Sequence, residues 1–310
     1  KRLQNMREKL IYIGYDLFLD LKLYKIPAET LYHLEKKNKL LRFVKIKNQD
    51  SKYLSKISIY WGNRITDDII QKAKNLKWIH FGSIGFDRVN INEMKSKKIM
   101  VTNSKGTMES SVMVTILGFM ISLSRGLNKI YDLRAINKLS RETFDKYFDR
   151  VSDLENQVCL IVGMGQVGLK LKKVCLSLGM KVLAHDKTIS EANITLKFYD
   201  DSKKTFTIET DPINTVLERS DFITLHIPKI DDKPIITSKE IKLMKTGAGI
   251  INTSRGGLID EDILMFSLEK KKLAYAALDV FSNEPTPSIH LLMQENISLT
   301  PHIGARRKNF

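Results

Sequence analysis

The chain of 310 residues is 43% hydrophobic and carries a formal net charge of +16. It is long enough for two domains with buried cores, and it lacks the roughly 18 uninterrupted apolar residues of a membrane span. Because its lysine-rich opening also lacks the apolar run of a secretory signal, we expect a cytoplasmic protein with no membrane partner.

The basic charge raises the question of a nucleic-acid partner, because clustered lysines and arginines bind phosphates. Here the basic residues are scattered, with short groups such as Lys36-Lys37, Lys97-Lys98 and Lys270-Lys271-Lys272. No aromatic interleaving and no zinc-finger or basic-zipper spacing accompanies them. We therefore expect a solvated basic surface, which could still steer anionic small substrates, and we do not expect a nucleic-acid partner.

Cys159 and Cys175 lie in apolar stretches, which predicts reduced and buried thiols without a disulfide. Two cysteines alone cannot form a metal site, so we expect no metal.

Short β-type runs alternate with amphipathic segments in the first hundred residues. The pattern predicts an α/β unit with strands at 9–15, 56–60, 77–81 and 98–102 and helices at 29–37 and 67–74. A long, mostly apolar helix is expected over 108–127, followed by a more exposed helix over 133–149. Such a helix pair needs other structure to cover its apolar side, so we expect a subunit or domain contact there.

From residue 156 the order changes to strand (157–162), glycine turn (163–168), helix (169–179) and strand (180–186). Further αβ units follow, with strands at 221–226, 249–252, 273–280 and 296–300. Three helix starts carry local signals: Asp211 as N-cap with Pro212 at the first helical position, a capping box of Thr237 and Glu240, and acidic residues 260–262 in a first turn. The succession predicts a doubly wound parallel sheet.

The glycine turn reads GxGxxG through Gly163, Gly165 and Gly168. It follows an apolar strand, opens a helix and precedes a strand ending at Asp186, about 20 residues further on, which is the context of a dinucleotide site. Gly163 permits a tight turn, Gly165 lets backbone amides approach a pyrophosphate, and Gly168 lets the helix pack on the sheet. Asp186 favours NAD by binding ribose hydroxyls, although the adjacent Lys187 leaves NADP open.

Downstream of the glycine turn lie three candidates for catalytic residues: Arg255, Glu284 and His302. Arg255 and His302 each follow a predicted strand, and Glu284 follows a strand and turn, so they can converge where the carboxyl ends of parallel strands line a crevice. An arginine can hold an oxoacid, and a histidine oriented by a carboxylate can move the proton that accompanies hydride transfer.

The chain resembles the D-isomer-specific 2-hydroxyacid dehydrogenases from about Asn75 to Gly304. The resemblance is carried by several motifs in the order of that family: HFGSIGFDRV, KIMVTNSKG, SSVMVTILGFMISLSRG, the glycine turn, SDFITLHIP, IKLMKTGAGIINTSRGGLIDED, AALDVFSNEP and LTPHIG. It implies an NAD-binding Rossmann domain at 104–302, a smaller flavodoxin-like α/β substrate domain at 1–103, and a return segment of which this chain contains 303–310.

The resemblance also implies roles for individual residues. His302 becomes the general acid/base, Glu284 its carboxylate partner and Arg255 the substrate clamp. The turn Ser83, Ile84, Gly85 would offer backbone amides to the substrate carboxylate. The residues implied in cofactor binding are Gly163, Gly165, Gln166, Val167, Gly168, Asp186, His226, Ile227, Pro228, Thr253, Ser254, Asp279 and Gly304.

The expected function is therefore reversible hydride transfer between NAD(H) and C2 of a small 2-oxoacid or D-2-hydroxyacid, in a homodimer built through helices at about 107–149. A second hypothesis is a non-catalytic, NAD-sensing scaffold like the corepressors related to this family. Retention of Arg255, Glu284 and His302 favours the enzyme, because a pure binding module does not require all three.

Overall fold

The computed structural model describes residues 10–16, 28–46, 52–63, 65–85, 89–147, 151–197 and 203–306. Parts of several expectations, including residues 9, 86–88, 148–149 and 307–310, lie outside these ranges. The described chain divides into an N-terminal unit ending at Met108 and a C-terminal unit, Glu109–Arg306. The division after Met108 falls a few residues beyond the expected boundary at 103/104.

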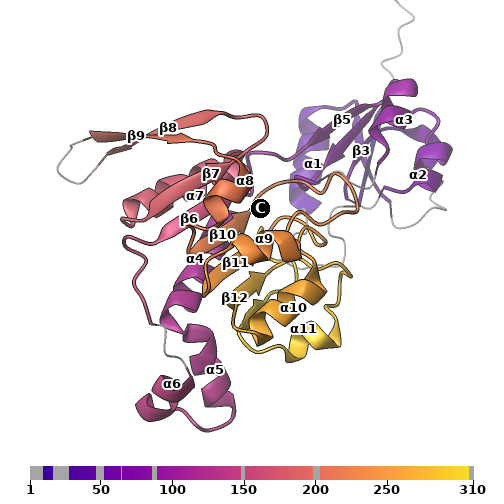
Figure 1. The fold of residues 1–310 in the computed structure, drawn as a ribbon. Helices are drawn as coiled ribbons and strands as arrows, with labels where there is room; N and C mark the ends of the chain where they lie inside the picture. The colour runs from indigo at the N-terminus through magenta and orange to yellow at the C-terminus, as the bar shows by residue number, and fades with distance from the viewer. Residues whose placement is uncertain are drawn as a thin grey trace, which may run out of the picture. The chain divides into compact units, whose positions relative to one another are not determined.

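The N-terminal unit is built on a five-stranded parallel sheet (Figure 1). Its elements are β1 (Ile11–Tyr15), α1 (Ala28–Lys37), β2 (Leu41–Lys45), the 3-10 turn η2 (Leu54–Lys56), β3 (Ile57–Trp61), α2 (Asp67–Lys72), β4 (Trp78–Phe81), α3 (Ile91–Ser96) and β5 (Met100–Asn103). The strand order β2-β1-β3-β4-β5 is that of flavodoxin-like folds, which confirms the expected fold class. The sequence pattern missed β2 and α3.

The C-terminal unit carries a six-stranded parallel sheet of order β13-β12-β11-β10-β6-β7. Its elements are α4 (Glu109–Arg125), α5 (Leu127–Ala135), α6 (Arg141–Tyr147), β6 (Val158–Val162), α7 (Gln166–Ser177), β7 (Lys181–His185), β8 (Glu191–Lys197), β9 (Lys203–Glu209), α8 (Ile213–Leu217), β10 (Phe222–Leu225), α9 (Ser238–Leu243), β11 (Ala248–Asn252), α10 (Glu261–Glu269), β12 (Leu273–Leu278), α11 (Ile289–Met293) and β13 (Ile297–Leu299). This confirms the doubly wound parallel sheet.

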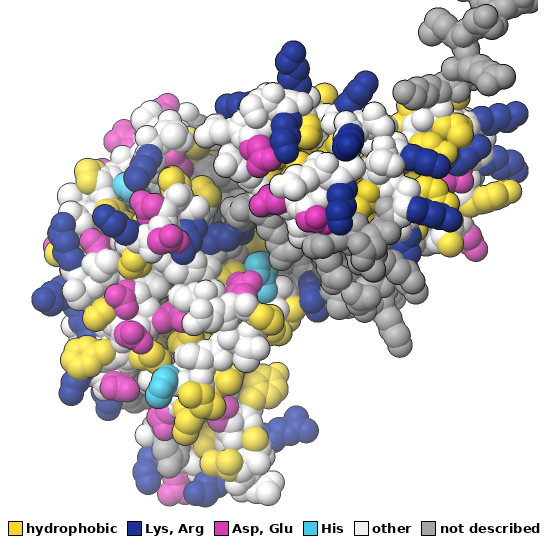
Figure 2. All heavy atoms as spheres, turned by 90° about the vertical axis from the view of Figure 1, so that its right-hand side faces the viewer, with side chains coloured by type: hydrophobic (Ala, Val, Ile, Leu, Met, Phe, Trp, Pro, Cys, Tyr) yellow, Lys and Arg dark blue, Asp and Glu magenta, His cyan; other side chains and the backbone are white. Residues whose placement is uncertain are grey.

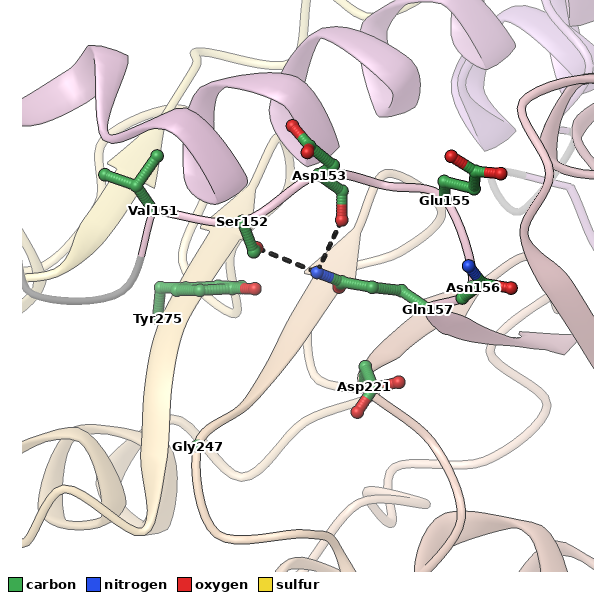
Figure 3. A pocket seen from close by; sticks show the side chains of 9 residues that line it. All are labelled: Val151, Ser152, Asp153, Glu155, Asn156, Gln157, Asp221, Gly247 and Tyr275. Atoms are coloured by element: carbon green, nitrogen blue, oxygen red, sulfur yellow. Dashed lines mark hydrogen bonds between the residues drawn. The ribbon is translucent and has the colours of Figure 1, made fainter.

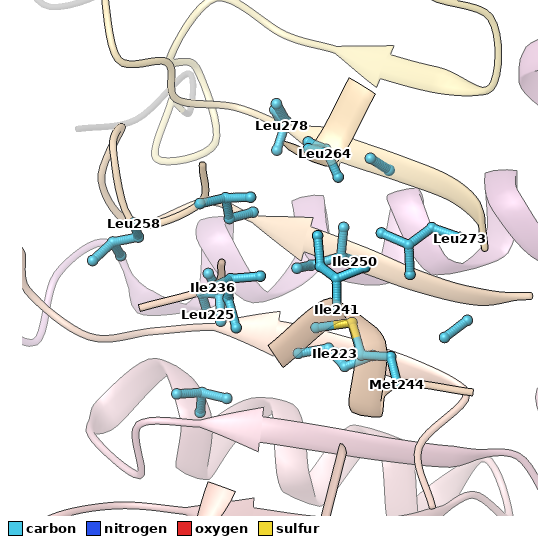
Figure 4. Close-up of a cluster of buried hydrophobic side chains, with 14 of the residues drawn as sticks. Ile223, Leu225, Ile236, Ile241, Met244, Ile250, Leu258, Leu264, Leu273 and Leu278 are labelled. Carbon is cyan, nitrogen blue, oxygen red and sulfur yellow. The ribbon is translucent and has the colours of Figure 1, made fainter. Parts of the chain in front are cut away.

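Two apolar clusters cover the two faces of this sheet. Side chains of α9 and α10 pack on one face, in the cluster that Figure 4 shows around Ile223 and Ile250. Those of α4 and α7 pack on the other, where Cys159 and Cys175 are buried and free, as predicted. Neighbouring strand residues alternate between the clusters because successive side chains point to opposite faces. The sheet is therefore covered by helices on both sides.

The helical segment between the two sheets differs from the predicted one. The long apolar helix is present as α4, but the predicted helix over 133–149 is wrong, because α5 ends at Ala135 and α6 begins at Arg141. Asn137 has a φ of +53° in the intervening turn, and Ser140 accepts a hydrogen bond from the Thr143 amide at the start of α6. No single described helix is long and apolar enough to span a membrane; α4 and α5 pass that test only as a pair bent by 71°.

The local helix signals were mostly correct. The capping box of Thr237 and Glu240 is present at α9, and Asp260 caps α10 ahead of Glu261 and Asp262. The expectation for α8 is wrong, because Pro212 is itself the N-cap residue and no side chain caps the helix. The extended ψ of 137° at Pro212 moves the first helical position to Ile213.

An antiparallel hairpin of β8 and β9 follows β7, the edge strand of the six-stranded sheet. It stands in place of a further parallel strand that would extend this sheet. An isolated bridge joins Thr210, the residue after β9, to Ala184 of β7. On the face shown in Figure 2, lysines and arginines are spread among acidic and hydrophobic side chains and form no continuous basic stripe.

Candidate active site

The glycine turn between β6 and α7 has the geometry that each glycine was predicted to provide. Gly163 has a φ of +101°, and a Cβ there would lie 2.7 Å from the carbonyl oxygen of His226. A Cβ on Gly168 would overlap the carbonyl oxygen of Gly163, so only glycine permits this close approach of helix and turn. By contrast, a Cβ on Gly165 would meet no other atom within 4 Å. Gly165 is the N-cap of α7, so the open backbone lies at a helix N-terminus, where an anion binds favourably.

Asp186 lies at the end of β7 and is held by the same turn. One carboxylate oxygen accepts a hydrogen bond from the Met164 amide at 2.7 Å, and the other accepts bonds from the amide and hydroxyl of Thr188 at 2.7 and 2.8 Å. Burial raises the pKa of Asp186, but these bonds and one from Ile189 outweigh it and hold the pKa below its ordinary value. Asp186 is therefore a fixed negative charge beside the open glycine turn, and these residues fit a dinucleotide.

His302 and Glu284 form a hydrogen-bonded pair. The Nδ1 atom of His302 lies 2.8 Å from Oε2 of Glu284, and Oε1 of Glu284 accepts a longer bond of 3.4 Å from the Phe281 amide. The His302 side chain is 50% exposed, and no hydrogen bond to its Nε2 atom is found among the described residues. With Nδ1 directed at the carboxylate, Nε2 is the atom that can exchange a proton with a ligand.

The turn that carries His302 is fixed by Asp279, at the end of β12. This buried carboxylate accepts hydrogen bonds from the hydroxyl of Thr300 at 2.6 Å and from the amides of Ile303 and Gly304, each at 2.8 Å. The Thr115 hydroxyl of α4 lies 3.2 Å from the carbonyl of Gly304 and also 3.2 Å from that of Ser111, so the two acceptors share its proton. No local signal in the sequence identifies Thr115, because Gly304 lies 189 residues away along the chain.

Arg255 follows β11, the strand next to β12. Its carbonyl accepts a hydrogen bond from the Asn252 side chain at 2.8 Å, and its Nη1 donates to the carbonyl of Ser254 at 2.7 Å. A Cβ on the adjacent Gly256 would overlap the carbonyl of Phe281, so this turn packs against the chain leading to Glu284. The fold thus brings the backbone of Arg255 toward the Glu284–His302 pair.

His226 comes directly after β10, and its carbonyl oxygen lies close to Gly163. Burial lowers its pKa to about 3, so the ring is neutral near pH 7. The Thr224 hydroxyl donates to the carbonyl of Leu160 and therefore accepts the hydrogen bond from Nε2 of His226 at 3.0 Å. This arrangement suits a residue lining the cofactor site together with Ile227 and Pro228, and it does not suit a general acid at neutral pH.

The predicted carboxylate-binding turn, Ser83, Ile84 and Gly85, belongs to the N-terminal unit and follows β4. Its three carbonyl groups are engaged: Ser83 accepts from the Ser104 amide at 3.1 Å, Ile84 from the Asn103 side chain at 2.6 Å, and Gly85 from the Ser83 hydroxyl at 2.9 Å. The three amides donate no hydrogen bond to any described residue. Such a turn offers donors and no acceptors, which is the requirement of an anion site.

A cavity of about 490 Å³ lies elsewhere, at the edge of the larger sheet where the strands begin (Figure 3). Its lining includes Asp153, Gln157, Asp221 and Tyr275, and the Gln157 amide donates to Ser152 and to the carbonyl of Asp153. Asp221 is already paired with Lys245 at 2.8 Å. Because ligands of open α/β sheets bind at the carboxyl ends of the strands, this cavity is not the candidate active site.

Comparison with protein families identifies the chain. The family model "D-isomer specific 2-hydroxyacid dehydrogenase, NAD binding domain" matches residues 117–304, and the model for the catalytic domain of that family matches residues 24–160. The chain belongs to this family. The dehydrogenases of this family are oxidoreductases, and the NAD-binding domain of the chain contains the glycine turn, Asp186 and the His302 pair.

Curated relatives include enzymes acting on different substrates. The hydroxypyruvate reductase of Thermotoga maritima is 34% identical over 246 residues, covering 78% of this chain and 75% of the relative. The D-3-phosphoglycerate dehydrogenase of Methanocaldococcus jannaschii is 32% identical over 246 residues, covering 79% of this chain. The match spans only 44% of that second dehydrogenase.

Solved dehydrogenases share the fold. The apo D-mandelate dehydrogenase of Rhodotorula graminis has a TM-score of 0.78 at 19% identity, covering 96% of this chain and 89% of that one. A D-lactate dehydrogenase from Aquifex aeolicus, complexed with NAD and lactic acid, has a TM-score of 0.71 at 24% identity, covering 94% and 88%.

Proposed function

We propose that the protein transfers a hydride reversibly between NAD(H) and C2 of a small D-2-hydroxyacid or 2-oxoacid. The observation that carries the proposal is the His302–Glu284 pair, with Nδ1 of the histidine 2.8 Å from the carboxylate, at the end of β13 in an NAD-binding fold. Bound NAD(H) would supply or accept the hydride.

His302 acts as general acid/base in this proposal. Glu284 holds the ring through Nδ1, so Nε2 donates its proton to the carbonyl oxygen of a 2-oxoacid during reduction and takes it back from the hydroxyl during oxidation. Arg255 offers a fork of donors to the oxoacid and polarises its carbonyl group. The amides of Ser83, Ile84 and Gly85 bind the substrate carboxylate.

NAD is favoured over NADP because the fixed charge of Asp186 would repel a 2′-phosphate. Lys187 is exposed and adjacent, and could compensate that repulsion in part. Two solved relatives are described with NADPH, an acyclic imino acid reductase and a glyoxylate/hydroxypyruvate reductase, so both cofactors belong in any assay.

We also propose a homodimer that buries the helical segment from α4 to α6. The large apolar side chains exposed in this segment support it: Val114, Ile121, Leu127, Tyr131, Ile136 and Leu139. Exposed apolar area of this kind is typical of surfaces that associate.

The test of the proposed function is a panel of 2-oxoacids, including glyoxylate, hydroxypyruvate and longer chains, assayed by oxidation of NADH and of NADPH. We expect turnover of at least one 2-oxoacid, with NADH preferred, and at least 100-fold lower kcat in His302→Ala. If the wild-type protein binds NADH but turns over no 2-oxoacid, the enzyme proposal is wrong and the scaffold hypothesis takes its place.

A further inference from the structure

His80, on β4 of the N-terminal unit, is bound at both ring nitrogens. Its Nδ1 atom lies 2.8 Å from the hydroxyl of Thr102, and its Nε2 atom lies 3.3 Å from the hydroxyl of Ser104. Thr102 lies opposite His80 on the neighbouring strand β5, and Ser104 comes directly after that strand. The flanking Ile79 and Phe81 are buried in the apolar core of the N-terminal unit, so His80 points to the opposite face of the five-stranded sheet.

The direction of each hydrogen bond follows from the number of protons available. Ser104 donates its only hydroxyl proton to the carbonyl of Phe81 at 2.9 Å, so it accepts from Nε2 of His80. The Nδ1 atom of a neutral ring is then an acceptor and receives the proton of Thr102. The Thr102 oxygen in turn accepts from the Trp78 indole at 2.8 Å. Burial lowers the pKa of His80, which favours the neutral ring that this arrangement needs.

This chain of bonds ends on the turn that we assign to the substrate carboxylate. The Ser104 amide donates to the carbonyl of Ser83, and the adjacent Asn103 donates to the carbonyl of Ile84. His80 therefore fixes Ser104, and Ser104 fixes the turn. These bonds occupy the carbonyl groups of Ser83 and Ile84, while the amides of Ser83, Ile84 and Gly85 donate to no described residue.

We propose that His80 is a positioning residue for carboxylate recognition, acting through Ser104 on the Ser83–Gly85 turn. The inference rests on the proposed function, because that function assigns the turn to the substrate carboxylate. It adds a residue that touches neither substrate nor cofactor but sets the affinity for the acid. Loss of the His80 bond leaves the Ser104 hydroxyl held by the Phe81 carbonyl alone and loosens the turn, which weakens binding of the carboxylate more than it slows hydride transfer.

The test compares His80→Ala, His80→Gln and Thr102→Val with the wild-type protein. His80→Ala should raise KM for the 2-oxoacid about tenfold while kcat and the Kd of NADH stay within about twofold. His80→Gln retains a side-chain donor for Ser104 and should recover most of the affinity. Thr102→Val, which leaves Nδ1 of His80 without its donor, should have an intermediate KM. His33→Ala, an exposed histidine on α1, is the matched control and should behave as wild type.

Oxamate, a carboxylate that is not reduced, separates this inference from the proposed function. Its Kd is measured calorimetrically on the NADH-loaded proteins and needs no turnover. A rise of about tenfold in His80→Ala, reversed in His80→Gln, supports the inference even if the substrate panel fails. The inference is overturned if oxamate binds the wild-type protein and the folded His80→Ala variant equally, if the glutamine variant gives no recovery, or if the wild-type protein does not bind oxamate.

Discussion

The carbonyl oxygen of Asp279 accepts a hydrogen bond from the amide of His302 at 2.8 Å. The same aspartate binds the residues on both sides of that histidine through its carboxylate, which accepts from Thr300, Ile303 and Gly304. His302 itself has a φ of +52°, a left-handed conformation that residues other than glycine adopt uncommonly. Asp279 thus fixes the conformation in which His302 meets Glu284.

Replacing Asp279 by asparagine tests this relationship. In Asp279→Asn an amide N–H₂ replaces one acceptor and opposes a backbone donor, so we expect the free energy of unfolding to fall by about 1–3 kcal/mol and kcat to fall at least tenfold. Urea unfolding and steady-state kinetics measure the two effects. Thr300→Val removes one donor only and should lower stability by about 1 kcal/mol. A change confined to the Kd of NADH would show that Asp279 contacts the nicotinamide without fixing the turn.

The glycine turn offers a matched pair of substitutions. Gly168→Ala places a methyl group against the Gly163 carbonyl and should destabilise the protein by about 1–3 kcal/mol. In Gly165→Ala the methyl group contacts no other atom, so stability should stay unchanged within about 0.5 kcal/mol. NADH binding should weaken, because the methyl group occupies the space that we assign to the pyrophosphate. Thermal unfolding and NADH titration separate the two outcomes. Equal loss of stability in both variants would refute the assigned roles.

His226 should make stability depend on pH. The pKa of His226 is about 3 in the folded protein and near 6.5 in the unfolded protein. Between these two pH values the ring is protonated in the unfolded state and neutral in the folded state. The free energy of unfolding therefore falls between about pH 6.5 and pH 3, by at most about 1.4 kcal/mol per pH unit. We expect His226→Gln to flatten this part of the profile relative to His290→Gln, an exposed histidine on α11. Parallel profiles for the two variants would be inconsistent with a buried, neutral His226.

Asp186 should determine cofactor preference. Asp186→Ala removes the charge that repels a 2′-phosphate and frees the amides of Met164 and Thr188, so the ratio of kcat/KM for NADH over NADPH should fall at least tenfold. The assay uses one 2-oxoacid with both cofactors at saturating substrate. An unchanged ratio would mean that Asp186 does not contact the adenosine ribose of the cofactor. Lys187→Ala serves as the companion variant and should shift the ratio toward NADH.

Features set by neighbouring residues were predictable from the sequence. The three glycines of the turn, the capping box of Thr237 and Glu240, and the strands of the larger sheet each depend on a short stretch of chain. The pairing of His302 with Glu284 was also expected, and here the resemblance to a family supplied what spacing alone cannot.

Features that depend on the conformation of a single residue or on distant residues were not predictable. The break between α5 and α6 contains Asn137 in a left-handed conformation, which no pattern in the sequence indicates. The sequence likewise gives no sign that Asp279 binds the turn 21 to 25 residues later, or that Thr115 reaches Gly304. His80 begins the motif HFGSIGFDRV, but the motif does not indicate the role of the histidine, which arises from Thr102 and Ser104.

The measurement that tests the central claim most directly is the fate of deuterium from NADH labelled at both C4 positions. The wild-type protein is incubated with the 2-oxoacid that it reduces fastest among those longer than glyoxylate, whose products are chiral at C2, and the product is analysed by chiral chromatography and mass spectrometry. Our account predicts the D-2-hydroxyacid with one deuterium, located at C2. The L-enantiomer, a product without deuterium, or no product from any 2-oxoacid would contradict it.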